Sequence, residues 1–184
     1  HSYGPPLGAM RAFLDAYEAA DYGAVAPDTR PLTVLAALGP RMLELARDRA
    51  DGAHPYMVTP EHTRMARAAL GPDRLLCTEQ KVLLESDRAK AFSISRSAAA
   101  LAMGLTLPNY RRSLMRLGFE EADFENGLSD RLVEGVVAMG EAEEIESRLT
   151  AHVEAGADHV CIHPMHPEGK SEPDWATLEA LAPS

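Results

Sequence analysis

The stretch Leu32-Thr-Val-Leu-Ala-Ala-Leu-Gly-Pro-Arg-Met-Leu-Glu-Leu-Ala46 decides the fold class of this chain. Its first seven residues carry no charge, and a short run of this kind is typical of a strand covered on both faces, as in a parallel sheet. Gly39-Pro40 then indicates a helix start, because proline is favoured at the first helical position. A strand that leads at once into a helix is the repeating unit of α/β proteins.

The same order of strand and helix recurs along the chain. We predict strands at Ala53–Val58, Leu75–Leu84 and Asp158–His163, in addition to Leu32–Leu38. Helical periodicity follows the second strand up to Leu70 and precedes the last one. Repeated βα units of this kind predict a parallel sheet with helices outside it.

Two architectures fit this pattern: a doubly wound open sheet, or part of an eight-fold barrel. A whole barrel needs about 200 residues or more, typically about 250, and this chain has 184 and half the strands. The first helical segment, residues 5–20, has no strand before it. We therefore expect an α/β fold forming the C-terminal half of a TIM-type (β/α)8 barrel. It would be one partial domain, 1–184, with a helical insertion at 87–140 that includes helices at Pro108–Leu117 and Ser129–Met139.

Composition excludes several classes of protein. The chain is 46% hydrophobic and 25% charged, with a net charge of −10 and no basic run. Such a chain is a poor candidate for binding nucleic acid or an anionic membrane. It holds no run near the roughly 18 apolar residues that a membrane span needs. Cys77 and Cys161 lack metal-ligand spacing, so we expect reduced core cysteines and a cytoplasmic location.

The turn after the first strand is a candidate anion site. Ala36, Ala37 and Gly39 are small enough to let a ligand approach the backbone, and the free amides of the next helix favour a phosphate. Arg41 could add positive charge. The alternative is that Leu38-Gly39-Pro40 is a strand-to-helix turn without a ligand.

Four further residues are candidates for lining a substrate pocket. His54 and Tyr56 come at the end of the second strand, Gln80 interrupts an apolar third strand, and Tyr110 opens a helix in the insertion, where barrels often carry a lid. For each, an ordinary structural role is an equally open interpretation.

The last strand is rich in histidine. Strand parity places His159, Cys161 and His163 on the inner face of the sheet and turns Val160 and Ile162 toward the helices. Positions four apart on a strand lie about 13 Å apart, which is too far to share one ion. We therefore predict no metal site. The P-loop motif, the G-x-G-x-x-G motif of dinucleotide-binding proteins and the G-x-S-x-G motif of hydrolases are also absent from the sequence.

An ordered set of segments resembles the luciferase-like monooxygenase superfamily, and within it the branch of probable coenzyme F420-dependent oxidoreductases. The set covers nearly the whole chain. Its segments are Pro6–Asp15, Val34–Ala46, Asp51–His62, Glu79–Glu85, Leu107–Tyr110, Ser129–Leu132 and Gly156–Val160.

The resemblance implies a barrel that binds F420, or FMN in relatives, at the C-terminal ends of its strands. It places the turn Ala36-Ala37-Leu38-Gly39-Pro40 against the cofactor and its phosphate. F420 is a deazaflavin that carries hydride, so the implied reaction is hydride transfer with a small organic substrate. The family's first strands usually supply the acid and base groups, so the resemblance assigns no catalytic residue here.

Two other functions stay open. One is an FMN-dependent monooxygenase of the same superfamily. The other is a non-catalytic half-barrel that serves as an assembly module. Exposed strand edges at Leu32–Leu38 and Asp158–His163 would invite pairing with another chain, so we expect a homo-oligomer or a separate N-terminal half-barrel as partner.

Overall fold

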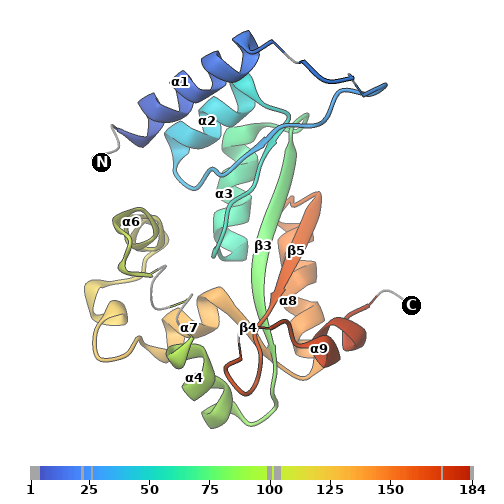
Figure 1. The fold of residues 1–184 in the computed structure, drawn as a ribbon. Coiled ribbons are helices and arrows are strands. Elements are labelled where there is room, and N and C mark those ends of the chain that lie inside the picture. The colour runs from blue at the N-terminus through green and yellow to red at the C-terminus, as the bar shows by residue number, and fades with distance from the viewer. Residues whose placement is uncertain are drawn as a thin grey trace.

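The computed structural model describes residues 5–21, 23–25, 27–98, 101, 105–170 and 172–182. Strands and helices alternate along most of the chain (Figure 1). In order they are α1 (Pro6–Ala19), β1 (Val34–Leu35), α2 (Pro40–Arg49), β2 (Gly52–Ala53), α3 (Pro60–Leu70), β3 (Leu75–Leu84), α4 (Arg88–Ser97), α6 (Pro108–Arg116), the 3₁₀ helix η1 (Glu121–Phe124), α7 (Asp130–Val136), β4 (Val137–Gly140), α8 (Ala142–Glu154), β5 (His159–Pro164) and α9 (Trp175–Ala180).

The long strand β3 organises a sheet in which every pairing is parallel. β2 pairs with the first residues of β3 and β4 with its last residues, along one edge, while β5 pairs along the opposite edge. β1 pairs with β2. Apart from β4, the spatial order β1–β2–β3–β5 therefore follows the sequence, as it does in a barrel wall.

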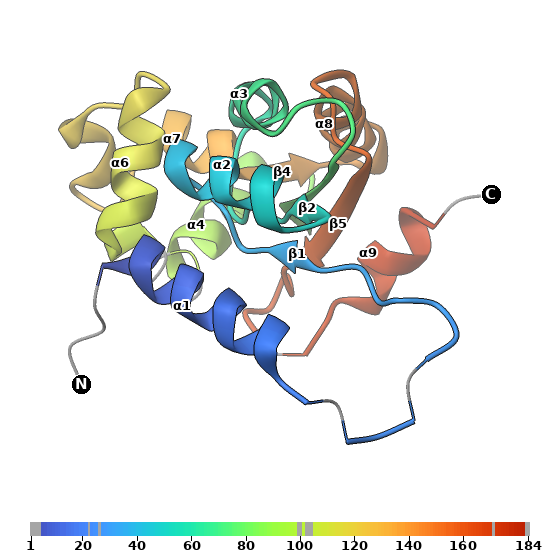
Figure 2. The same ribbon diagram turned by 90° about the horizontal axis from the view of Figure 1, so that it is seen from above.

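Helices α2, α3 and α8 cover one face of this sheet, which is seen most clearly from above (Figure 2). On that face Val82 of β3 packs with Ala138 and Ile145, and Ile162 of β5 joins them. A second core, formed by α1, α2, α3 and the strands β1 and β2, includes Leu43. Burial of these apolar side chains stabilises the helical layer against the sheet.

Local sequence explains where the helices begin. Prolines 6, 40, 60 and 108 open α1, α2, α3 and α6, where the missing N–H costs no hydrogen bond. Thr59 caps α3 by accepting the backbone N–H of His62. The predicted parallel sheet and its flanking helices are thus present, and β3 has the predicted bounds.

The prediction of a helix over Ser129–Met139 was wrong in its last three residues. The helix ends at Val136, and β4 pairs its four residues with Lys81–Leu84 of β3. The physical reason is that the β-branched Val137 suits a buried strand, and that end of β3 offers an open edge. The last four residues of the predicted insertion at 87–140 therefore belong to the sheet.

The two cysteines also differ from expectation. Both are free thiols, but Cys161 is exposed and Cys77 half-buried, so Cys161 is not a core residue. The reason is strand parity: Cys77 and Cys161 belong to the sheet face that points away from α8. Across the described ranges, no helix is long and apolar enough to cross a membrane.

Candidate functional site

The turn after β1 presents backbone to a possible ligand. Gly39 is the N-cap of α2 in an extended conformation, and Arg41, in the first turn, is exposed. Ala37 is buried, so its methyl group belongs to the core. Leu38 is held in place because its carbonyl oxygen lies 2.8 Å from Nε2 of the buried His62.

A cation that sequence reasoning missed lies beside this turn. A Cβ built on Gly39 would meet Nη1 of Arg116 at 3.7 Å, an ordinary contact distance. Arg116 ends α6, is exposed, and forms no ion pair with any described residue. The structure thus brings a guanidinium from the insertion to the positive end of α2, where both favour an anion.

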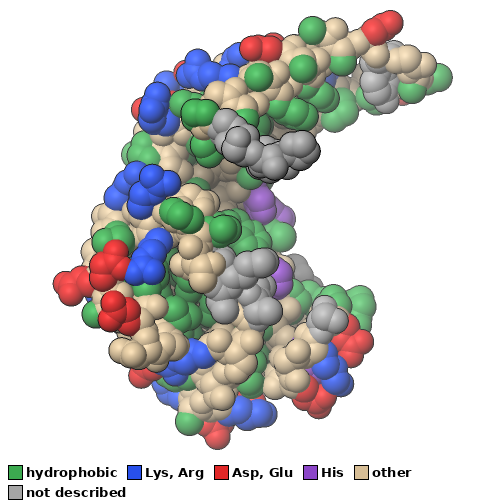
Figure 3. Space-filling model, turned by 60° about the vertical axis from the view of Figure 1, so that its left-hand side comes forward, with side chains coloured by type: hydrophobic (Ala, Val, Ile, Leu, Met, Phe, Trp, Pro, Cys, Tyr) green, Lys and Arg blue, Asp and Glu red, His purple; other side chains and the backbone are tan. Residues whose placement is uncertain are grey.

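A second group of polar side chains lies on the sheet face opposite α8. Glu79 and Lys81 point away from α8, whereas Gln80, between them, points toward it. Lys81 is the register partner of His163 on β5. The Lys81 Nζ atom lies 3.1 Å from Oε1 of Glu79, and both side chains are almost completely buried. In Figure 1 β3 and β5 lie in front of α3 and α8, and Figure 3 shows this front side of the molecule hollowed, with histidine side chains in the hollow.

Tyr56 connects the buried ion pair to the last strand. Lys81 Nζ donates to the Tyr56 hydroxyl at 2.6 Å and also lies 4.2 Å from the centre of its ring. The same hydroxyl lies 3.2 Å from Nδ1 of His163. Lys81, Tyr56 and His163 therefore form one continuous hydrogen-bonded chain, which we call the Lys–Tyr–His chain.

The surroundings of His163 favour its neutral form. Burial lowers the pKa of His163, and the positive charge of Lys81 lowers that pKa further, while Glu79 opposes the shift. Glu79 Oε1 is 3.6 Å from His163 Nδ1, but Lys81 is closer to that carboxylate. A neutral imidazole has one donor and one acceptor nitrogen, so the tautomer of His163 sets the direction of the hydrogen bonds along the Lys–Tyr–His chain.

Tyr110 extends this group from the insertion. It is half-buried and packs, with Tyr56, against the apolar cluster that includes Leu83. Burial raises the pKa of the Tyr110 hydroxyl, and the negative charges that Tyr56 and Glu79 can carry raise that pKa too. Two of the four residues predicted to line a pocket, Tyr56 and Tyr110, are thus brought together.

The other two predicted residues are placed differently. His54 is half-buried, and its Nδ1 lies 2.6 Å from the backbone oxygen of Cys77. Gln80 lies on the opposite face of β3, where its side chain bonds to His152 of α8 and to the carbonyl of Val136. The expectation that Gln80 faces the pocket is wrong, because neighbouring residues on a strand point to opposite faces.

A cavity of about 930 Å³ opens at the C-terminal end of β5. One side comes from Ser93, Ile94, Ser97 and Ala98, at the end of α4, and the other from residues 162–170, 172 and 173. His163 belongs both to this cavity and to the Lys–Tyr–His chain. In parallel βα folds ligands bind at the C-terminal ends of the strands, so this cavity is a candidate ligand site.

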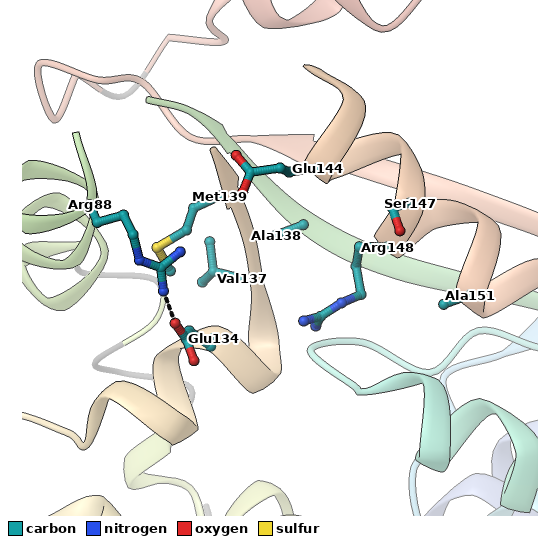
Figure 4. A pocket seen from close by; sticks show the side chains of 9 residues that line it. All are labelled: Arg88, Glu134, Val137, Ala138, Met139, Glu144, Ser147, Arg148 and Ala151. Atoms are coloured by element: carbon teal, nitrogen blue, oxygen red, sulfur yellow. Dashed lines mark hydrogen bonds and ion pairs between the residues drawn. The ribbon is translucent and has the colours of Figure 1, made fainter. Parts of the chain in front are cut away.

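A smaller cavity of about 320 Å³ lies on the α8 side of the sheet (Figure 4). An ion pair between Arg88 and Glu134 lies at one wall. From α8, Arg148 donates to the carbonyl of Gly135 at 3.2 Å, and burial lowers the pKa of its guanidinium. This cavity is on the other face of the sheet from the Lys–Tyr–His chain. Among the described residues, no group of three or more His, Cys, Asp or Glu side chains could hold a metal ion.

Comparison with solved structures defines the fold class. The parallel strands and their outer helices match part of a TIM-type (β/α)8 barrel, which confirms the predicted class. One matching structure is an F420-dependent secondary alcohol dehydrogenase in complex with an F420–acetone adduct. It is 13% identical over 96% of this chain and 60% of its own, with a TM-score of 0.56. Another is apo-MsnO8, which is 15% identical over 98% of this chain and 60% of its own, with a TM-score of 0.58.

The match is one of fold and not of close sequence. No family model matches the chain, and no curated protein matches it. The chain spans about 60% of the length of the two structures above.

Proposed function

We propose that this chain is the C-terminal part of an F420-dependent oxidoreductase of the luciferase-like superfamily. The observation that carries the proposal is the open turn at Gly39, at the start of α2, with the guanidinium of Arg116 beside it. A dehydrogenase that uses F420 shares the fold over 96% of the chain, which supports the same assignment.

The residues at the turn fit the phosphate of such a cofactor. Gly39 leaves its side free of any contact under 3.7 Å, and Arg116 and Arg41 bring positive charge. In the first turn of α2 the backbone N–H of Arg41 is the one that a phosphate would meet, because Pro40 has no N–H and those of Met42 and Leu43 donate to the Gly39 carbonyl. Ala36, Leu38 and Pro40 would contribute backbone atoms or outer walls of this cradle, and Ala37 its buried support. When bound, F420 supplies hydride transfer, and the chain's part is to hold it and exclude water.

The site can be tested by fluorescence titration of the 184-residue chain with F420 and, separately, with FMN. Gly39→Val is the informative variant. The φ of −95° at Gly39 suits valine, and the space for its Cβ is open, so the fold should tolerate it while the branched side chain blocks the cradle. Gly23→Val is the matched control, because a Cβ at position 23 meets nothing within 4 Å.

The proposal predicts saturable F420 binding that Gly39→Val weakens at least tenfold and Gly23→Val leaves unchanged. Tighter binding of FMN than of F420 would move the assignment to an FMN-dependent monooxygenase. If the Gly39→Val variant binds F420 as tightly as the unmodified chain, the turn at Gly39 is not part of the cofactor site.

The sheet edges support a proposal about partners. Among the described residues β1 pairs with β2 and β5 with β3, so each keeps one edge without a strand. We infer that further strands add at these edges, from a second copy or from an N-terminal half-barrel. Sedimentation of the chain at increasing concentration tests this: a monomer at every concentration excludes the second copy.

A further inference from the structure

We propose that His163 presents its Nε2–H to the oxygen atom of the substrate, in the cavity beside β5, and donates the proton that this oxygen needs. Tyr56 positions His163 and supplies the proton behind it, and Lys81 stabilises the tyrosinate that results. The inference rests on the proposed oxidoreductase function and names its substrate as a neutral carbonyl compound, or the corresponding alcohol in reverse.

The direction of the Lys–Tyr–His chain follows from its chemistry. An ammonium group can only donate, so the 2.6 Å contact uses a lone pair of the Tyr56 oxygen. We assign the hydroxyl hydrogen of Tyr56 to its other partner, Nδ1 of His163, at 3.2 Å. A neutral imidazole that accepts at Nδ1 must carry its hydrogen on Nε2.

Exposure places His163 at the point of contact with a ligand. The Glu79 and Lys81 side chains are 3% and 1% exposed, whereas the His163 side chain is 44% exposed and lines the 930 Å³ cavity. A buried charge pair thus lies behind a neutral donor that can meet the ligand. A neutral N–H donor suits a neutral oxygen acceptor.

The cavity wall agrees with an apolar substrate that has one polar function. Ile94, Ala98, Pro164 and Met165 supply hydrocarbon surface around His163. Lys170, at the rim, is paired with the carboxylates of Glu168 and Glu172 and so is already neutralised. These walls fit a ketone or aldehyde better than a carboxylate or phosphate ester.

The proton that the oxygen takes comes from the chain and is replaced from water. With a bound cofactor as hydride donor, addition of hydride to the carbonyl carbon would break the C=O π bond, and the oxygen would take the proton from Nε2 of His163. Nδ1 would then take the proton of the Tyr56 hydroxyl, and water would return a proton to that hydroxyl after the product leaves. The resulting tyrosinate is stabilised by the Lys81 ammonium, which stays charged beside Glu79. Oxidation of an alcohol follows the same path in reverse.

The first test needs no cofactor. In the ¹⁵N-labelled 184-residue chain, long-range ¹H–¹⁵N spectra report the tautomer of each histidine, and His163→Gln assigns the signal. We expect a single Nε2–H tautomer for His163 at neutral pH, and a mixture of tautomers in Tyr56→Phe. An Nδ1–H tautomer, or a signal that Tyr56→Phe does not change, overturns the proposed direction.

The second test uses cyclohexanone as the probe. Its addition should shift the Nε2 resonance of His163 saturably and leave that of His159, on the same strand, unchanged. A saturable shift at His159 in place of His163, or no shift at either up to the solubility limit of the ketone, overturns the substrate class. Both tests are independent of F420 titration, so a failure of cofactor binding is distinguished from a failure of this inference.

The third test is kinetic and uses the F420-loaded protein. Gln can donate a hydrogen bond but cannot transfer its proton, so His163→Gln should lower kcat roughly 100-fold and change KM little. His159→Gln, on the same strand but outside the cavity lining, should change kcat less than twofold. An equal loss in both variants would overturn the role of His163.

Discussion

The carboxylate of Glu79 accepts the backbone N–H of Met57 at 2.8 Å, so β3 holds the turn that follows β2. Met57 has a φ of 56°, an unfavourable conformation for a non-glycine residue. Tyr56, immediately before it, is thereby kept against Lys81. One buried carboxylate therefore both pairs with Lys81 and fixes the backbone that carries the tyrosine of the Lys–Tyr–His chain.

Replacement of Glu79 by glutamine should destabilise the fold strongly. The amide oxygen can still accept from Met57, but Lys81 would be left as a buried charge without a counter-charge, at a cost of about 3 kcal/mol. Urea denaturation of Glu79→Gln measures the loss. Glu168→Gln, at an exposed ion pair with Lys170, is the control and should change stability by less than about 0.5 kcal/mol. Similar losses of stability in Glu79→Gln and Glu168→Gln would contradict a buried ion pair between Glu79 and Lys81.

Stability should fall between pH 6.5 and pH 4 because of His152. This side chain is fully buried between Thr63 and Gln80, and burial, with the charge of Arg148 as the next cause, lowers its pKa to about 4. Since the unfolded chain takes up the proton at a higher pH, the stability present above pH 6.5 is lost as pH falls through 4. The full effect is on the order of 3 kcal/mol.

Chemical denaturation at pH 7.5, 6, 5 and 4 measures this slope. His152→Gln keeps polar atoms at the site but does not titrate, so the variant should show a shallower decline over the same range. His166→Gln, in the loop after β5, serves as the control and should keep the wild-type slope. If His152→Gln also keeps that slope, other groups cause the decline.

Gly52→Ala should disrupt the pairing of β2 with β3. A Cβ at position 52 would collide with the backbone oxygen of Leu75, and backbone cannot move aside without breaking the ladder. We expect a loss of roughly 3 kcal/mol or more. Thermal unfolding compares this variant with Gly23→Ala, where the space is open; an unchanged Tm for Gly52→Ala would contradict the close approach.

Arg67→Lys should weaken the link between α3 and the start of β5. The Arg67 guanidinium donates to the carbonyls of Gly71, Arg74 and Gly156 and also pairs with Asp158. A lysine ammonium cannot reproduce this planar set of donors, so we expect a loss of about 1–3 kcal/mol in urea. Arg47→Lys, at an exposed ion pair with Asp48, is the control and should lower the free energy of unfolding little. Equal losses in the two variants would show that the planar set of donors of Arg67 does not matter.

Arg116→Gln should weaken F420 binding if its guanidinium faces the cofactor phosphate. A single exposed charge of this kind is expected to contribute several-fold in affinity, and more at low salt. Arg112→Gln, on the same helix, is the matched control, because Arg112 donates to the carbonyl of Pro108. Titration at two salt concentrations distinguishes the roles: a salt-independent loss would indicate that Arg116 acts by packing.

Local sequence predicted most of the fold for identifiable reasons. Helix starts were visible because proline and capping residues mark them, and β3 was visible because ten residues pass without a turn signal. β4 was missed because Val136 and Val137 continue a helical pattern directly. The strand conformation from Val137 onward depends on the open edge of β3, whose paired residues lie 56 positions earlier in the sequence.

The candidate site was harder to predict because its parts come from distant segments. Lys81 and Glu79 lie in a strand that reads as mostly apolar, and their charges are tolerated inside only because each finds the other. Strand parity correctly placed His163 on the inner face, yet parity could not show that Tyr56 lies within hydrogen-bond distance. Arg116 reaches Gly39 through the packing of the insertion, which no local pattern encodes.

The exposed thiol of Cys161 gives this chain a built-in reporter. Cys161 is the register partner of Glu79 on the face that bears the Lys–Tyr–His chain, while Cys77, the other thiol, is half-buried. Alkylation of Cys161 by a small maleimide would therefore slow whenever a ligand, a second copy or another half-barrel covers that face. Timed labelling thus follows occupancy of the hollow without any engineered probe.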